Sequence, residues 1–259
     1  MNKDKFCKLE DMRPTQASVG LQEVEAKEWE ILNIPKEDLK NWLEKKPIPA
    51  VLSPDSKMYL IDHHHLGLAL FRLSERYSYE HPHSKKDNPY THCAFTIVKD
   101  FSKTELTHDE FFKCLESINM LHPYNEKGLK ISVAELPKHI ADLKDDPYRS
   151  LAGFVRKSGG FQKSTAPYTE FKWADYFRDK IPEDLIKNDI QGAIAKANIL
   201  IKNDPKCKEL PGYIENSSIK ELSNEHVGLV LNKEKVNQSI SQIIQQNNQI
   251  NSNNKNKLN

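Results

Sequence analysis

The sequence has no long apolar run. None of its stretches approaches the roughly 20 apolar residues that a membrane-spanning helix needs. The N-terminal residues MNKDKFCKLEDM also contain no apolar core of the kind that a signal peptide carries. These absences predict a cytoplasmic protein without a membrane partner, although a protein exported without such a signal would look the same.

Cysteine pairs, a phosphate loop and a dominant charge are absent as well. The four cysteines are far apart in sequence and form no CxxC pair, which argues against a cysteine-based zinc site and against a disulfide framework: Cys7, Cys93, Cys114 and Cys207. No GxxxxGK phosphate loop is present. The formal net charge is +1, so general electrostatic attraction to nucleic acid is not expected, and a local basic patch is the remaining route to such a partner.

The composition supports a folded core. Hydrophobic residues make up 37% of the chain and charged residues 29%, which is typical of a buried core under a heavily charged surface. We expect an α/β core over 1–100 and a helical extension packed on it over 101–215. A possible helical appendage over 216–244 and a disordered Asn-rich tail over 245–259 would follow.

Apolar spacing and turn residues place the elements of the core. They predict an extended segment over 12–19, a helix over 21–32 and a second helix from Pro35. A hairpin over 48–52 and 58–61 is expected around a turn at Pro54, followed by a helix over 64–76. A polar loop over 77–91 and a strand over 93–98 complete this part.

The remainder reads as mainly helical. The pattern Ser102-Lys103-Thr104-Glu105 fits a capping box before an apolar helical stripe. Further helices are expected over 168–178 and 183–201. Phe171 and Trp173 are assigned to the core, in preference to a role in stacking on a ligand.

The residues Asp62-His63-His64-His65 stand where a predicted strand runs into a helix. Unpaired N–H groups and the helix dipole favour anions at such a point, and these side chains could hold a phosphate, bind a metal ion or move a proton. The alternative is that Asp62 caps the helix while the histidines pack or face water. No HExxH pattern supports a metal site, and adjacent residues on a helix do not face one another.

Together with other motifs, this stretch resembles the ParB/sulfiredoxin superfamily, and within it the branch named for ParB-like nucleases. The resemblance is carried in chain order by Arg13-Pro14-Thr15-Gln16, Val19-Gly20, Ile48-Pro49-Ala50-Val51, Tyr59-Leu60-Ile61-Asp62-His63-His64-His65, Ala69-Leu70, Asp145-Asp146-Pro147-Tyr148-Arg149-Ser150, Gly159-Gly160-Phe161, Glu170-Phe171, Trp173-Ala174-Asp175, Arg178 and Leu210-Pro211-Gly212-Tyr213. His65 stands where arginine is frequent in the ParB box, so an arginine clamp is not expected at that position.

The resemblance implies an α+β fold, with a small mixed sheet and helices followed by a mainly helical part. It also implies binding of a nucleotide or phosphate, with Mg²⁺ as the charge partner, and phosphoryl transfer or phosphodiester hydrolysis as the reaction. Glu23 is then the catalytic base and His64 the second catalytic residue. The alternative for Glu23 is a solvated glutamate on a helix face. The residues expected to hold the phosphate or nucleotide are Arg13, Thr15, Gln16, Asp62, His63, His65 and Arg149.

Other functions stay open on the sequence alone. A non-catalytic nucleotide switch or DNA-binding module is one alternative, although no helix-turn-helix is recognisable. A protein that binds a small molecule or peptide on the same fold is another. Sulfiredoxin-like chemistry is not expected, because that chemistry needs a cysteine in the box and none is adjacent to it here.

Overall fold

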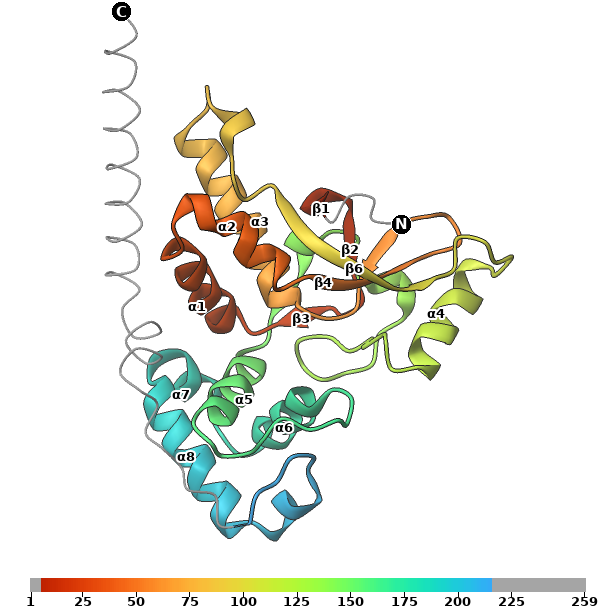
Figure 1. Ribbon diagram of the computed structural model, residues 1–259. Helices are drawn as coiled ribbons and strands as arrows, with labels where there is room; N and C mark the ends of the chain where they lie inside the picture. The colour runs from red at the N-terminus through yellow and green to blue at the C-terminus, as the bar shows by residue number, and fades with distance from the viewer. Residues whose placement is uncertain (1–5, 216–259) are drawn as a thin grey trace, which may run out of the picture.

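A mixed sheet of five strands forms the centre of the N-terminal part (Figure 1). The computed structural model describes residues 6–215, so the expected appendage over 216–244 and tail over 245–259 lie outside it. The strands follow the order β1-β6-β4-β5-β2, with bounds β1 Phe6–Lys8, β6 His92–Asp100, β4 Ile48–Leu52, β5 Met58–Leu60 and β2 Met12–Pro14. Pairs β1–β6 and β4–β5 are antiparallel, whereas β4–β6 and β2–β5 are parallel.

The predicted hairpin is the β4–β5 pair, in which Ala50 lies opposite Leu60. Ser53 closes its turn, because its N–H donates to the Lys57 carbonyl oxygen over 2.9 Å. Side chains alternate between the two faces along each strand. Ala50 and Leu60 therefore belong to one core cluster, and Val51 and Tyr59 belong to another.

Helices cover both faces of this sheet. The first core cluster lies under α1 (Leu21–Leu32), α2 (Lys36–Glu44) and α3 (His64–Glu80). On the other face, α4 (His108–Ser117) packs Phe111 and Phe112 against Tyr59, with ring centroids 5.5 and 5.4 Å apart. Figure 1 shows α1–α3 and α4 on opposite sides of the strands.

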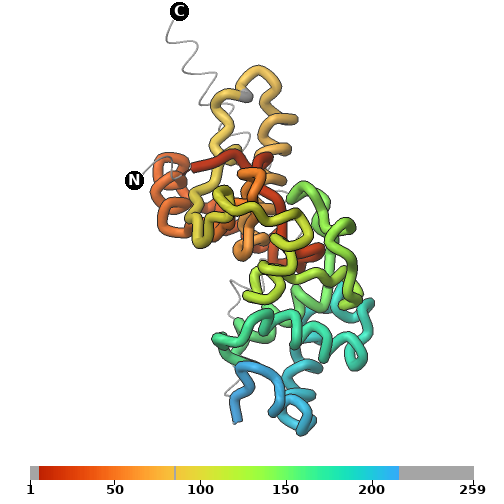
Figure 2. Tube along the Cα trace, turned by 90° about the vertical axis from the view of Figure 1, so that its right-hand side faces the viewer, coloured from red at the N-terminus to blue at the C-terminus, as the bar shows by residue number. Residues whose placement is uncertain are grey.

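Four further helices form a separate core below the sheet. They are α5 (Pro147–Lys157), α6 (Thr169–Arg178), α7 (Glu183–Asn188) and α8 (Ile190–Asn203). Trp173 is fully buried among them and stacks on Phe161 with ring centroids 4.5 Å apart. Figure 2 shows this helical part as a body next to the sheet part. The α+β class with a mixed sheet and a helical C-terminal part is confirmed, while the exact domain boundaries stay predictions.

Two neighbouring acids start two different helices where the parts meet. A short parallel pair, β3 (Ser18–Val19) with β7 (Lys144–Asp145), brings them together. The Asp145 carboxylate accepts the N–H of Leu21 at the start of α1 over 2.9 Å. The Asp146 carboxylate caps α5 by accepting the N–H of Tyr148 over 3.0 Å, and it pairs with Arg178 at 2.9 Å. This dipeptide therefore fixes α1 relative to α5.

Three local predictions differ from the structure. The capping box is Thr107 with Glu110, since Ser102 instead donates its hydroxyl to the carboxylate of Asp100 in a turn. The helix predicted over 64–76 continues to Glu80 and takes up the first residues of the expected loop. The helix predicted over 183–201 is two helices, because Asp189 leaves the helical conformation at φ −144° and caps α8.

Candidate functional site

The turn between β5 and α3 is made by a residue in a left-handed conformation. His63 has φ 60° and ψ 26°, which costs a non-glycine residue about 1–2 kcal/mol. The Asp62 carboxylate accepts the N–H of His63 over 2.7 Å and holds this turn. The sharp turn places His64 and His65 in the first turn of α3, where no side chain caps the helix.

His64 is held by the segment after β2. Its Nε2 accepts the backbone N–H of Thr15 over 3.3 Å, and the Thr15 hydroxyl donates to the Leu60 carbonyl oxygen over 2.7 Å. The side chain is 3% exposed, and this burial lowers the pKa of His64 to about 3. The imidazole is therefore neutral at pH 7, and because Nε2 accepts a hydrogen bond, the proton is on Nδ1.

His65 is held in the same way from the other side. Its Nε2 accepts the N–H of Gly20 over 3.2 Å, and burial lowers the pKa of His65 to about 3. Glu23 Oε2 lies 3.6 Å from the same nitrogen. Since that nitrogen already accepts a hydrogen bond, it carries no proton, and its contact with Glu23 is not an ion pair.

Glu23 stands in a buried cluster of cations between α1 and α5. Arg149 Nη1 lies 2.8 Å and Lys157 Nζ lies 3.2 Å from its two carboxylate oxygens. Burial by itself would raise the pKa of Glu23, but the positive charges of Arg149 and Lys157 outweigh it and bring the pKa down to about 2. The carboxylate is therefore ionised and only weakly basic, and its contacts favour a role in holding Arg149 over the predicted role of catalytic base.

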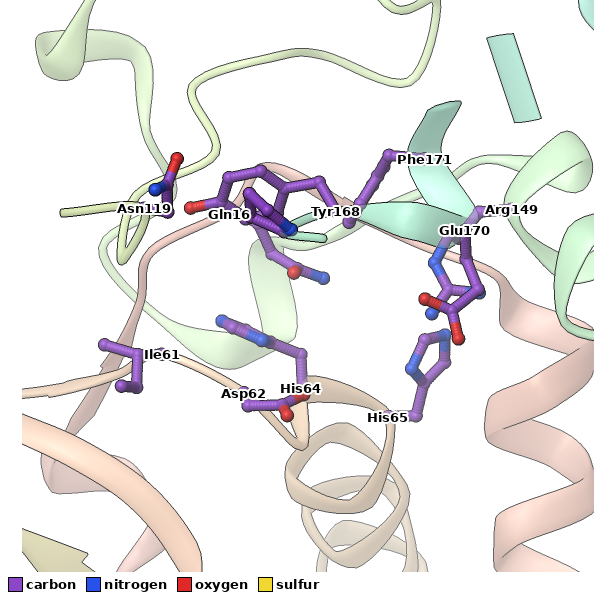
Figure 3. Close-up of a pocket in the computed structure, with 11 residues that line it drawn as sticks. Gln16, Ile61, Asp62, His64, His65, Asn119, Arg149, Tyr168, Glu170 and Phe171 are labelled. Atoms are coloured by element: carbon purple, nitrogen blue, oxygen red, sulfur yellow. The ribbon is translucent and has the colours of Figure 1, made fainter. Parts of the chain in front are cut away.

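A pocket of about 230 Å³ opens in front of the first turn of α3 (Figure 3). His64 and His65 rise from the helix, with Gln16 and Tyr168 across the cavity and Arg149 beside His65. Gln16 is fixed by its side-chain amide, which donates to the Ser18 carbonyl oxygen over 2.7 Å. The pocket therefore lies between the sheet part and the helical part, and both contribute residues to its lining.

One wall of the pocket is aromatic. The guanidinium of Arg149 lies 5.3 Å from the ring centroid of Phe171, within the range of a cation–π contact. The Phe171 ring also packs on His122 at 3.9 Å, and His122 packs on Tyr168 at 4.6 Å. Burial lowers the pKa of His122 to about 4, so this imidazole is also neutral at pH 7. The wall therefore offers flat, uncharged rings next to one guanidinium.

The structure brings together five of the nine predicted site residues. Those that line the pocket are Gln16, Asp62, His64, His65 and Arg149. The other four lie outside the lining. Arg13 lies opposite Tyr59 in the β2–β5 pair, Thr15 holds His64 from behind, Glu23 holds Arg149, and His63 is exposed at the turn. Their assigned roles stay predictions.

Several pocket residues were not predicted. They come from α4 and α6 or the loops beside them: Asn119, Tyr168, Glu170 and Phe171. Asn119 lies just after the C-cap of α4 at φ 57°, and the N–H of the next residue, Met120, donates to the carbonyl oxygen of Leu115. An asparagine after an apolar helix was the one signal available. Tyr168 precedes α6 at φ 57° with no local signal. Phe171, assigned to the core, lines the pocket, whereas Trp173 is core.

Within residues 6–215, no three side chains of His, Cys, Asp or Glu converge to hold a metal ion. The pocket carries two carboxylates, and that of Glu170 pairs with Arg156 Nε at 2.9 Å. Asp62 is the exposed one, and its carboxylate is the donor that fits a magnesium ion bound together with a phosphate. None of the helices within residues 6–215 combines the length and the apolar character that a membrane span requires.

Comparisons with known proteins give one family match and one match to a solved structure. The model of the family described as "Putative ParB-like nuclease" matches residues 6–179. The crystal structure of protein Atu1540 from Agrobacterium tumefaciens is similar, with 34% sequence identity and a TM-score of 0.64. That match covers 81% of this chain and 96% of the other chain. No curated protein matches the sequence.

Proposed function

This chain belongs to the ParB-like nuclease family, and from that membership we propose that its pocket binds the phosphate of a nucleotide or of a nucleic-acid chain at the first turn of α3. One observation carries the proposal: Arg149, His64 and His65 line the same small cavity in front of an uncapped helix N-terminus. First-turn N–H groups and the helix dipole attract anions, and a guanidinium matches the oxygens of a phosphate.

Each group would have a distinct role. Arg149 supplies the positive charge, since His64 and His65 are neutral at pH 7. The two imidazoles offer Nδ1–H as hydrogen-bond donors, because backbone N–H groups occupy both Nε2 atoms. The rings of Tyr168 and Phe171 offer a surface on which a base or sugar can pack.

The size of the pocket favours a phosphate with part of its sugar. At about 230 Å³ it is smaller than the roughly 300–1,000 Å³ of pockets that enclose a drug-sized ligand. The remainder of a nucleotide, or the next residues of a nucleic-acid chain, would lie along the aromatic wall. Magnesium would enter with the phosphate and bind the carboxylate of Asp62, since Mg²⁺ is commonly held by one or two carboxylates and by phosphate oxygens.

Phosphoryl transfer or phosphodiester hydrolysis is the second candidate function. Two observations favour it: His63 and Tyr168 hold left-handed backbone conformations beside the pocket, and burial strongly shifts the pKa values of His64 and His65. Strained backbone and shifted pKa values are enriched at catalytic sites. His64 would position the phosphate, and Asp62 is the pocket carboxylate free of an ion pair among the described residues. A non-catalytic nucleotide or DNA-binding module is the alternative.

The test is binding of nucleotides and inorganic phosphate, with and without Mg²⁺, measured by calorimetry and by the rise in melting temperature. Arg149→Lys keeps the charge beside Glu23 but loses the planar fork, so the affinity should fall about tenfold or more. Arg72→Lys is the matched control, because Arg72 also pairs with a glutamate of α1, Glu28 at 2.8 Å, but lies outside the pocket, and it should bind like wild type. Equal affinities of the two variants would contradict the proposed site.

Turnover separates the two functions. Wild-type protein that binds a nucleotide with Mg²⁺ is incubated with nucleotides, hydroxyl acceptors and single-stranded and double-stranded DNA. Release or transfer of phosphate that Asp62→Asn abolishes would support the enzyme. Binding without turnover of any of these substrates would leave the binding module as the function of the pocket.

A further inference from the structure

Two cysteines that are 86 residues apart in the sequence face each other in the sheet. Cys7 on β1 and Cys93 on β6 are directly paired in the antiparallel register, and their Sγ atoms are 3.7 Å apart. Both are free thiols. Their separation in sequence argued against a disulfide framework, but sequence spacing does not reveal which strands become neighbours.

We propose that Cys7 and Cys93 are an oxidisable thiol pair, which a hydroperoxide converts into a disulfide between β1 and β6. This site lies outside the pocket at α3, whose lining contains neither cysteine. The class of ligand is a small peroxide, either hydrogen peroxide or an organic hydroperoxide.

The geometry needs little rearrangement. Residues directly opposite each other on antiparallel strands have Cα atoms about 4.5–5.5 Å apart, which falls within the range that a disulfide spans. The sulfur atoms must approach by about 1.7 Å, from 3.7 Å to the length of an S–S bond. Rotation of two short side chains supplies a movement of this size without displacing the strands.

The two thiols have different surroundings, and these assign their roles. Cys93 is fully buried, with Met12 Sδ 3.4 Å from its sulfur, whereas Cys7 is partly exposed at the edge of the sheet. The hydrogen bond with Cys93 lowers the pKa of Cys7, while the same bond and burial raise the pKa of Cys93. Cys7 is therefore the thiol that meets the peroxide as a thiolate, and Cys93 is the resolving thiol.

The reaction balances in two steps. The Cys7 thiolate attacks one peroxide oxygen, the O–O bond breaks, and Cys7 becomes a sulfenic acid while the other oxygen leaves as hydroxide or alkoxide and takes up a proton. Cys93 Sγ then attacks the Cys7 sulfur, the S–O bond breaks, and the hydroxyl leaves as water with the proton of Cys93. Two thiols lose two electrons in total, and the peroxide gains them.

The bond would tether the start of the chain. β1 is an edge strand that pairs with β6 alone within the described residues. The chain runs from β1 through β2 to Thr15, whose N–H holds His64 in the pocket. Oxidation would therefore fix the segment that supports one wall of the site.

The experiment treats the reduced, full-length protein with hydrogen peroxide, quenches it, and counts free thiols after unfolding. We expect the number of thiols to fall from four to two, the mass to fall by two hydrogen atoms, and peptide mapping to join Cys7 to Cys93. The melting temperature should rise on the order of 5–10 °C, because a cross-link over a long loop restricts the unfolded chain. A reductant should reverse all of these changes.

Variants provide the controls. Cys114→Ser should cross-link like wild type, since Cys114 lies on α4, away from the pair. Cys7→Ser and Cys93→Ala should each abolish the cross-link, and the first of these leaves the buried core unchanged. Three outcomes would each overturn the proposal. All four thiols could remain, Cys7 could be oxidised to a sulfinic acid without a cross-link, or the disulfide could include Cys114 or Cys207.

Discussion

The carboxylate of Glu23 occupies the space where any residue other than glycine at position 153 would place its Cβ. Both oxygens of Glu23 would lie 2.3 Å from that atom, well inside contact distance. α5 therefore carries a notch at Gly153, with Arg149 one turn before it and Lys157 one turn after it on the same face. The notch lets a carboxylate from α1 reach two cations on α5.

Filling this notch should destabilise the protein. In Gly153→Ala, the gain of about 1 kcal/mol in helix propensity opposes the loss from overpacking and from the displaced ion pairs. Because Glu23 is buried and cannot move aside freely, we expect the free energy of unfolding to fall by about 1–3 kcal/mol in denaturant titrations. Gly192→Ala is the control: its methyl would meet the exposed Asp189 side chain, and a smaller change is expected. Equal effects would show that Glu23 gives way easily.

Glu23→Gln tests whether this residue is a base or a support for Arg149. Removing the charge leaves two cations without their anion, so we expect a loss of about 2–4 kcal/mol in the free energy of unfolding. Phosphate affinity should change as well, because Arg149 loses the partner that orients it. A catalytic base predicts the opposite pattern, in which affinity is intact and kcat falls about 10²–10⁴-fold. Glu30→Gln removes a half-exposed carboxylate between Lys27 and Lys46 and should cost less than about 1 kcal/mol.

The protein should lose stability in mild acid. His64 and His65 have pKa values of about 3 in the folded state and 6.5 in the unfolded chain, so below pH 6.5 protons bind mainly to the unfolded state. Stability is therefore full above pH 6.5 and falls as the pH drops towards 3, by up to about 1.4 kcal/mol per pH unit for each residue. Melting temperatures between pH 6.5 and 5 exclude the titration of Glu23, whose unfolded pKa is 4.5. In this window His122, whose folded pKa is about 4, adds to the loss of stability, and Glu28, whose pKa burial raises to about 7, opposes it.

In the same pH window, His65→Gln should reduce the slope, since glutamine can accept the N–H of Gly20 without titrating. An unchanged slope in His65→Gln would mean that this imidazole titrates alike in the folded and unfolded chain.

The left-handed backbone at Asn119 predicts different stabilities for two substitutions at this position. Asn119→Gly should change the free energy of unfolding by less than about 0.5 kcal/mol, because glycine adopts φ 57° without strain. Asn119→Ala should lower it by about 1–2 kcal/mol, since a Cβ without a compensating polar group is disfavoured there. Unfolding in urea measures both. Similar stabilities would show that the end of α4 can rearrange.

Local patterns were enough to find the strand-to-helix junction. Apolar strand residues, a proline turn and a run of polar residues before an apolar helical stripe all lie within a short stretch around His64. The fold class and the family followed from such stretches taken in order. The prediction was wrong where two similar patterns lie close together. Ser102 with Glu105 and Thr107 with Glu110 both match the capping-box pattern, and only the second pair caps the helix.

The other half of the pocket could not be predicted from the sequence. His122, Tyr168 and Phe171 come together through the packing of α6 against the loop after α4, and no spacing within the chain encodes that contact. The same holds for Glu23 and Arg149, which are 126 residues apart. A glutamate beside other glutamates on a helix reads as solvated, and its burial becomes evident only once Gly153 is seen opposite it.

The strand order also determines which strands can pair early while the chain is being synthesised. β4 and β5 are joined by a short turn and can pair as soon as both have been made. β1 must wait for β6, which is 86 residues further along at the Cys7–Cys93 pair, or roughly 4–17 s at ordinary elongation rates. During that interval β1 has no partner strand, and the Cys7 thiol is accessible to oxidants, to disulfides and to alkylating reagents. A ribosome-bound chain that ends before His92 should therefore be modified at Cys7 by a thiol-alkylating reagent far faster than the finished protein is.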